Sequence, residues 1–188
     1  MALENRLKEY RARLGINQAD MGKLAGVSRQ TISLIERGDY SPSVTLALKL
    51  AKICQVTVEM GTPEFRAAQI PVVSLGEYVL EHKITVCGEN YTMTCLSMGN
   101  PHAVIPVEDV EKISIAKTGS AFEHLSCFPD RINTEFIQTL DQHTIKMRVW
   151  ERGSGETLSC GTGACAAAVA AMLSGCVSEG ETAVELRG

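Results

Sequence analysis

The chain has 188 residues, of which 45% are hydrophobic and 21% charged, which excludes a disordered polypeptide and leaves room for one ordinary domain or two small ones. No apolar run reaches membrane-spanning length, and the charged start from Glu4 onward argues against a signal peptide. Residues 1–58 carry nine Lys/Arg and five Asp/Glu, whereas residues 59–188 carry nine and seventeen. This asymmetry suggests two parts with different partners, the basic part facing a polyanion, although two ordinary solvated surfaces would give the same counts.

The basic part has the pattern of short helices joined by turns, with apolar residues at helical spacing. Gly26 is expected to turn the chain between the second and third helices, and Ser28 to cap the third. The predicted helices are Leu3–Leu14, 18–25, 29–37 and 43–54. The predicted small core includes Leu24, Ile32 and Ile35.

The stretch from Asn17 to Lys52, NQADMGKLAGVSRQTISLIERGDYSPSVTLALKLAK, resembles the Cro/repressor-type (Xre-like) helix-turn-helix family without a gap. The resemblance implies an all-α, lambda-repressor-like domain over residues 1–58 that binds DNA with its third helix in the major groove. The residues then expected to face bases are Arg29, Gln30, Thr31 and Ser33. Phosphate contacts are expected from Gln18 and Arg37. Such repressors usually bind as dimers, so a homodimer is a possible partner. A four-helix protein-interaction module with a basic face is the alternative.

The pattern changes from residue 59, where short alternating runs typical of half-exposed strands appear. The predicted strands are 70–75, 79–86, 91–96, 103–107, 134–140, 144–150 and 182–186. Helices are predicted over 110–124, broken near Gly119, and over 160–173. Because the second helix is small and apolar on every side, we expect it to be enclosed inside a curled sheet. Residues 59–188 therefore predict an α+β lobe.

One segment of this lobe, ERGSGETLSCGTGACAAA from Glu151 to Ala168, places Cys160 at a glycine turn that opens an alanine-rich helix. Bare N–H groups and the partial positive charge of the helix start favour a thiolate, so the pKa of Cys160 is expected to fall. The same N–H groups could hold a carboxylate. Gly161, Gly163 and Ala166 also match the dinucleotide fingerprint, but the strand that must directly precede it is missing, which makes a nucleotide site the weaker interpretation.

Four islands resemble diaminopimelate epimerase in order and spacing: EMGTPEF (59–65), MGNPHAV (98–104), FPDRINTEFIQ (128–138) and ERGSGETLSCGTGACA (151–166). The resemblance implies an isomerase of lysine and peptidoglycan biosynthesis that converts LL- to meso-diaminopimelate. It uses no cofactor. One cysteine thiolate removes the α-proton and a second thiol protonates the opposite face.

Carried over to this sequence, Cys160 is one of the two catalytic cysteines. The residues that would hold the polar ends of the substrate are Asn100, Asn133, Glu151 and Arg152, and the backbone N–H groups of Gly161 and Thr162 would bind a carboxylate. Glu151 and the asparagine oxygens are suited to accept from ammonium groups. His102 lies in the same region. The alternative for Asn100 is a simple turn residue, and for Glu151 and Arg152 an exposed ion pair.

The seven cysteines form no C-x-x-C pair, so we expect neither a metal site nor a redox dithiol, and the reducing cytoplasm is the expected location. The absence of a cofactor is implied by the resemblance. The likeness covers only the C-terminal lobe of the family, and the sequence ends where closing strands would be expected. No second cysteine has surroundings like those of Cys160. The junction, residues 55–59, suits either family and contains no flexible linker, so a natural, an engineered and a misjoined fusion all stay open.

Three functions compete on these grounds. The first is a DNA-binding domain joined to an epimerase-like lobe that lacks full epimerase activity, so whether the chain is an enzyme stays open. The second is a transcriptional regulator that senses diaminopimelate or a similar amino acid through this lobe. The third is a non-functional chimera.

Overall fold

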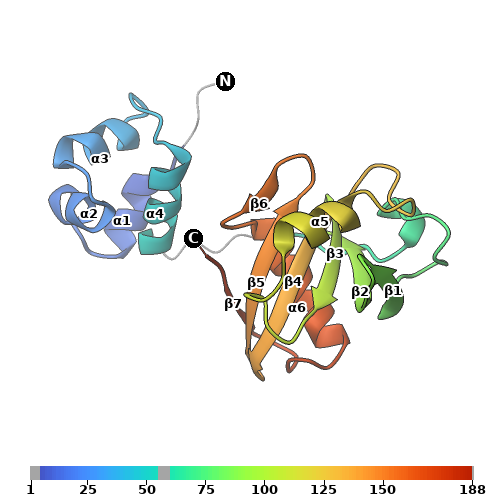
Figure 1. Cartoon of the computed structure of the whole chain (residues 1–188). Helices are drawn as coiled ribbons and strands as arrows, with labels where there is room; N and C mark the ends of the chain where they lie inside the picture. The colour runs from blue at the N-terminus through green and yellow to red at the C-terminus, as the bar shows by residue number, and fades with distance from the viewer. Residues whose placement is uncertain (1–4, 55–59, 188) are drawn as a thin grey trace. The chain divides into compact units, whose positions relative to one another are not determined.

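The structure is a computed structural model that describes residues 5–54 and 60–187 (Figure 1). The chain divides into two compact units, Met1–Glu59 and Met60–Gly188, and each is considered by itself. The expected junction, residues 55–59, lies outside the described residues, so the boundary stays a prediction. Within the described residues, no helix is both long and apolar enough to cross a membrane.

The first unit is a bundle of four helices, as predicted: α1 (Leu7–Arg13), α2 (Gln18–Ala25), α3 (Arg29–Glu36) and α4 (Val44–Cys54). The Asn17 side chain caps α2, and the Ser28 hydroxyl caps α3 by accepting from the Thr31 N–H at 3.0 Å. Gly26 ends α2 in the left-handed region, with φ of 73°, where glycine is favoured. These caps explain why both helices begin and end where the sequence indicates.

The core prediction for this unit was wrong at Leu24, whose exposed fraction is 62%. Met21 and Ala25, one turn apart on α2, occupy the buried face instead, and Leu24 falls outside it. Ile32 and Ile35 are buried as expected, together with Leu7, Leu46, Leu50 and Cys54.

The second unit is an α+β lobe with one sheet and two principal helices, as predicted. Its elements are η1 (Ala67–Gln69), β1 (His82–Val86), β2 (Glu89–Ser97), β3 (Pro101–Pro106), α5 (Ile115–Glu123), β4 (Asn133–Asp141), β5 (Thr144–Glu151), β6 (Gly155–Thr157), α6 (Gly161–Leu173) and β7 (Ala183–Glu185). The strand order is β1-β2-β3-β4-β5-β6, and β7 also pairs with β5. The β3–β4 and β5–β7 pairs are parallel and the others antiparallel. The sheet is not closed.

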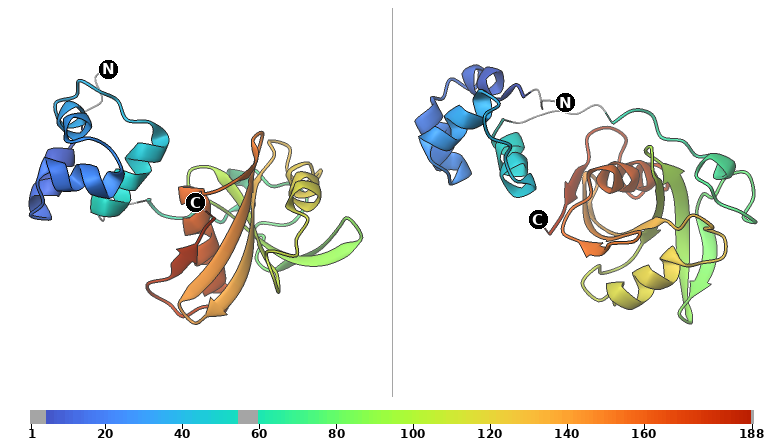
Figure 2. Two further views of the ribbon diagram at one scale, coloured as in Figure 1. Left: turned by 60° about the vertical axis from the view of Figure 1, so that its left-hand side comes forward. Right: turned by 90° about the horizontal axis from the view of Figure 1, so that it is seen from above.

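The sheet curves around α6 and carries α5 on its opposite face (Figure 2). One core packs α6 against side chains such as Leu96, Ile137 and Met147, and a second core packs Phe122 of α5 against Phe136. The predicted enclosure of α6 is therefore only partial. Ala166, Ala167, Ala170 and Ala171 are buried, but Leu173 is 58% exposed because the curled sheet covers one side of the helix.

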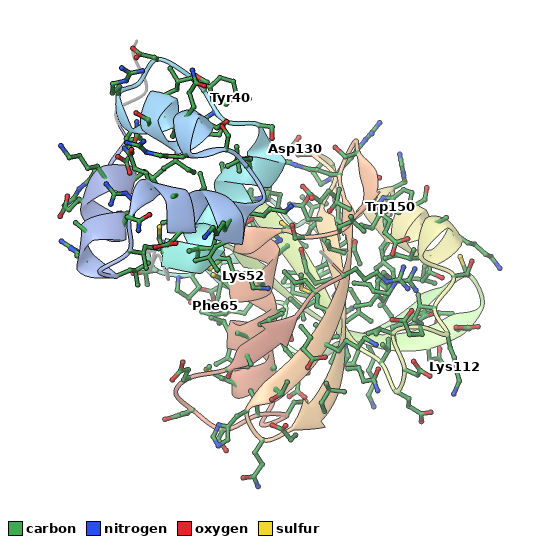
Figure 3. The ribbon with its side chains drawn as sticks, turned by 90° about the vertical axis from the view of Figure 1, so that its left-hand side faces the viewer. Tyr40, Lys52, Phe65, Lys112, Asp130 and Trp150 are labelled. Atoms are coloured by element: carbon green, nitrogen blue, oxygen red, sulfur yellow. The ribbon has the colours of Figure 1, made fainter. Side chains whose placement is uncertain are left out.

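Three local predictions in this unit were wrong. Residues 70–75 form turns after η1 rather than a strand, although Ile70 and Val72 are buried. The short strand β6 was not predicted. Gly119 does not break α5 but lies within it. A Cβ at this position would come within 2.6 Å of the Trp150 side chain, which lies beside α5 (Figure 3). A close approach between helix and sheet, not a turn, explains this glycine.

Candidate functional site

The predicted site residues of the second unit gather at one end of the sheet. The parallel strands β3 and β4 begin there, with His102 opposite Asn133 in the register, and Thr134 at the start of β4 pairs with Trp150 near the end of β5. Asn100 precedes β3, and Glu151 ends β5. The α6 start joins them, because Gly163 in its first turn lies against Glu135 of β4. Residues far apart in the sequence thus meet at one place.

Cys160 is the N-cap of α6, and its sulfur accepts from the Gly163 N–H at 3.3 Å and lies 3.5 Å from the Thr162 hydroxyl. The N–H groups of Gly161 and Thr162 belong to the first turn, which has no intrahelical acceptor for them, and no described side chain accepts from them. A half-buried thiol therefore lies beside two free donors, as the sequence indicated.

The expected fall in the pKa of Cys160 was wrong. Burial of the sulfur raises the pKa of this thiol, and the nearby Glu151 carboxylate raises it further. The Thr162 hydroxyl and the Gly163 N–H favour the thiolate but do not outweigh burial. A local sequence pattern shows the helix start but not the apolar and acidic surroundings that tertiary packing brings to it.

Behind this thiol lies a buried glutamate that the sequence analysis missed. Glu135 is fully buried on β4, and its Oε1 lies 2.7 Å from Nδ1 of His102, which is also fully buried. The other ring nitrogen of His102 lies 3.0 Å from Oδ1 of Asn100. Burial raises the pKa of Glu135 despite the neighbouring imidazole. The signal available in the sequence was strand alternation, which puts Glu135 on the same face as Asn133 and the apolar Ile137.

The two predicted asparagines already hold protein partners. Oδ1 of Asn133 accepts from the Arg152 N–H at 3.0 Å, and its Nδ2 donates to the Pro101 carbonyl at 3.1 Å. Oδ1 of Asn100 faces the His102 ring. Oδ1 of Asn133 is thus already occupied by a protein N–H, and Oδ1 of Asn100 lies against a ring nitrogen. The binding of an ammonium group by these two oxygens stays a prediction. Among the predicted acceptors for an ammonium group, Glu151 is the carboxylate.

Glu151 and Arg152 do not form the exposed ion pair that was the alternative for them. Oε1 of Glu151 accepts from the Thr157 hydroxyl, and the Arg152 guanidinium donates to the Asp130 carbonyl at 3.0 Å, in the loop before β4 (Figure 3). The turn after Glu151 is held by Glu123, which accepts from the Gly153 N–H at 2.9 Å.

The predicted DNA-contacting residues of the first unit divide into two groups. Arg29 and Gln30 are exposed at the start of α3, with no side-chain hydrogen bond to the described part of the chain. The others have protein partners or less exposure. Gln18 donates to Glu36 at 2.8 Å, the Thr31 hydroxyl lies 2.9 Å from that of Ser28, Arg37 pairs with Asp39 at 3.1 Å, and Ser33 is half-buried.

No set of three His, Cys, Asp or Glu side chains within residues 5–54 and 60–187 is arranged to hold a metal ion. The site is therefore composed of a thiol, backbone N–H groups, amides, carboxyl groups and one guanidinium. Such a set can bind a small molecule that carries both carboxylate and ammonium groups.

Comparisons with known proteins give two matches along the chain. Residues 94–188 match the family model of diaminopimelate epimerase, and residues 7–60 match a helix-turn-helix model.

Several curated relatives of the C-terminal part are described as diaminopimelate epimerase. The protein of Thermosynechococcus vestitus is 50% identical over 140 residues, which covers 71% of this chain and 49% of the relative. That of Gloeothece citriformis is 51% identical over 136 residues, covering 71% and 48%, and that of Methanococcus maripaludis is 44% identical over 143, covering 76% and 52%. The chain thus spans about half the length of the curated relatives it matches.

Proposed function

Because the chain belongs to the diaminopimelate epimerase family, with a helix-turn-helix unit ahead of the matching residues, we propose that its second unit binds diaminopimelate or a similar amino acid and exchanges the α-proton through Cys160. The observation that carries this proposal is the thiol of Cys160 beside the free N–H groups of Gly161 and Thr162. These N–H groups would bind the α-carboxylate, which brings the α-carbon to the sulfur.

The acidic side of the same site suits the ammonium group. Glu151 ends β5 at the same end of the sheet, and its carboxylate acts on the Cys160 thiol, so we assign to it the ammonium group of a ligand bound there. Arg152 begins the neighbouring turn and would contact a distal carboxylate once released from the Asp130 carbonyl. A zwitterionic substrate would therefore meet complementary charge at both ends.

One thiol can remove or deliver a proton on one face of a carbon only. The other cysteines of the described ranges lie elsewhere: Cys54, Cys95 and Cys127 are buried in other cores, Cys87 is at the β1–β2 turn, Cys165 is further along α6, and Cys176 follows that helix. We therefore propose exchange of the α-proton with retained configuration, and little or no inversion by this chain alone.

The test is incubation of LL-diaminopimelate with the purified chain in D₂O, with deuterium uptake and the meso isomer measured in the same tube. We expect slow uptake that Cys160→Ala abolishes and Cys87→Ala leaves unchanged, without meso product. Meso product at a rate comparable to uptake would refute the one-faced mechanism. Absence of both, with no binding of the amino acid, would refute the proposed function itself.

A second proposal concerns the first unit, which we infer to bind DNA. It is supported by Arg29 and Gln30, exposed at the start of α3 in a bundle that matches the helix-turn-helix model. Arg29→Ala is expected to relax base specificity in a selected operator, whereas Arg37→Ala should weaken all sequences alike and reduce the salt dependence. If the chain is an amino-acid sensor, added diaminopimelate would also shift the affinity for the operator.

A further inference from the structure

The second unit contains two buried glutamates whose surroundings are opposite. Glu123, 3% exposed, accepts from the Trp150 indole N–H at 2.7 Å, from the Gly153 N–H at 2.9 Å and from Arg131 at 3.2 Å. Glu135, fully buried, has His102 as its single side-chain partner, and its Oε2 contacts no donor in the part of the chain that the structure describes.

This difference implies different protonation states. An ionised carboxylate accepts at both oxygens and is strongly disfavoured where it is buried without donors. Glu123 has three donors, which hold its pKa below the ordinary value although burial raises it. Glu135 lacks such donors, and burial raises its pKa. A protonated carboxyl requires fewer hydrogen-bond donors, because its O–H has an acceptor in the His102 ring and its carbonyl oxygen carries little charge.

The hydrogen bonds around His102 are consistent with a protonated Glu135. Its O–H would donate to Nδ1 of His102 at 2.7 Å, which leaves the ring proton on Nε2 to donate to Oδ1 of Asn100 at 3.0 Å. Each of the two donors in this series of hydrogen bonds, the Glu135 O–H and the His102 Nε2–H, then has one acceptor. An ionised Glu135 would require either a charged imidazole in a fully buried position or a ring proton on Nδ1, which leaves Nε2 an acceptor opposite Oδ1 of Asn100 unless the amide is turned over. In each case the charge would be buried with Oε2 facing no donor among the described residues.

We propose that Glu135 is a neutral carboxylic acid that positions Asn100 through His102. Since the Asn100 oxygen is held by the ring, the amide directs its N–H₂ group away from the ring as a donor. No described residue accepts from this group. Resting on the proposed function, we assign to Asn100 the binding of a ligand carboxylate rather than of an ammonium group.

The neutral state also affects the thiol. A Cβ placed on Gly163 would lie 2.7 Å from Oε1 of Glu135 and 3.1 Å from the sulfur of Cys160, so the carboxyl and the thiol line the same small space. A negative charge on Glu135 would oppose the Cys160 thiolate. The titratable groups that face this thiol are Glu135 on β4 and Glu151 on β5, with His102 on β3 behind the first. With Glu135 neutral, Glu151 is the carboxylate that acts on Cys160.

The test is long-range ¹H–¹⁵N spectroscopy of the histidine rings in the full chain from pH 5 to 8, with the His102 signals assigned by their loss in His102→Gln. At pH 7 to 8 we expect the ring proton of His102 on Nε2. Glu135→Gln should keep this tautomer, since an amide N–H can replace the carboxyl O–H, whereas Glu135→Leu should release it to a mixture. An imidazolium at pH 7 to 8, a proton on Nδ1, or a changed tautomer in Glu135→Gln would overturn the proposal.

A second measurement covers the case in which Glu135→Leu fails to fold. The alkylation rate of Cys160 by iodoacetamide, followed on its own peptide by mass spectrometry, should be unchanged in Glu135→Gln from pH 6 to 9. If Glu135 were ionised, loss of its charge would speed labelling at pH 7 by about threefold or more. Glu123→Gln is the matched control, expected to lower stability without changing the His102 spectrum. These readouts need no turnover, so they stand apart from the deuterium-exchange test.

Discussion

At the scale of single residues, Gly163 is the position where the candidate site is most tightly packed. It belongs to the first turn of α6, and its N–H holds the Cys160 sulfur. Its missing side chain leaves the space that the Glu135 carboxyl and the sulfur line together. Glycine is required here for close approach and not for an unusual backbone conformation.

We therefore expect Gly163→Ala to destabilise the second unit by about 1–3 kcal/mol, because the new methyl group must displace a buried carboxyl or the thiol. Urea denaturation of the full chain, followed by the Trp150 fluorescence, measures this. Gly161→Ala is the matched control, since a Cβ there meets nothing within 4 Å. Equal stability of the two variants would contradict the packing argument.

The location of Cys160 could be predicted from the sequence, because a helix start and its glycine turn are local features. The direction of its pKa shift could not be predicted, since burial of the sulfur and the approach of Glu151 come from packing. The hydrogen bonds of Asn100 and Asn133 could not be predicted either, because their partners lie on other elements.

At the scale of elements, the first unit is joined across α1, α2 and α3 by one polar cluster. Arg11 pairs with Glu36 at 2.6 Å, with side chains 15% and 4% exposed, and Gln18 donates to the second oxygen. Although burial raises it, the pKa of Glu36 is held below its ordinary value by the Arg11 guanidinium and the Gln18 amide. Gln18, which was predicted to contact a DNA phosphate, thus also positions the Arg11–Glu36 ion pair between the helices.

Because the folded pKa of Glu36 is depressed, the stability it contributes is present above its ordinary value of 4.5 and lost as the pH falls through the lowered value. Glu36→Gln should remove this dependence and destabilise the first unit at pH 7 by about 3 kcal/mol, since Arg11 is left nearly buried without its partner. Amide hydrogen exchange of α1–α3 in the full chain measures both effects.

The control for this prediction is Glu9→Gln, which removes the exposed pair between Arg6 and Glu9. We expect no measurable change, because exposed pairs are screened by solvent. A comparable loss in both variants would show that burial of the Arg11–Glu36 pair is irrelevant.

Helix ends that carry a local signal agreed with the sequence, whereas the predictions for residues 70–75 and for Gly119 failed because distant contacts decide them. The end of α2 followed from Gly26 and the start of α3 from Ser28. Residues 70–75 are apolar enough for a strand, but apolar runs are buried in turns as well as in sheets. The reason for a glycine within α5 is the close approach of Trp150, about thirty residues away in the chain.

At the scale of the whole molecule, two families meet in one chain, and the two proposed activities should be separable. Arg29→Ala is expected to reduce operator selectivity while α-proton exchange is unchanged. Cys160→Ala should abolish exchange while DNA binding is unchanged. Gel-shift titrations and the D₂O assay on both variants measure this.

A loss of both functions in either variant would contradict this independence. A Cys160→Ala chain that no longer responds to diaminopimelate in the gel shift, yet binds DNA normally, would instead favour the sensor among the proposed roles. Sedimentation in the same buffers would test the homodimer, which stays a prediction.

The sequence by itself determined the two families, the helical bundle followed by an α+β lobe, and Cys160 at the start of α6, because ungapped motifs, caps and glycine turns are local properties of the chain. Only the tertiary structure decided what surrounds that thiol. The parallel pairing of β3 with β4 brings His102 beside Asn133, and strand alternation then turns Glu135 inward behind the sulfur. The protonation of Glu135 and the orientation of the Asn100 amide depend on burial and on partners far along the chain, so they are decided only when the sheet forms.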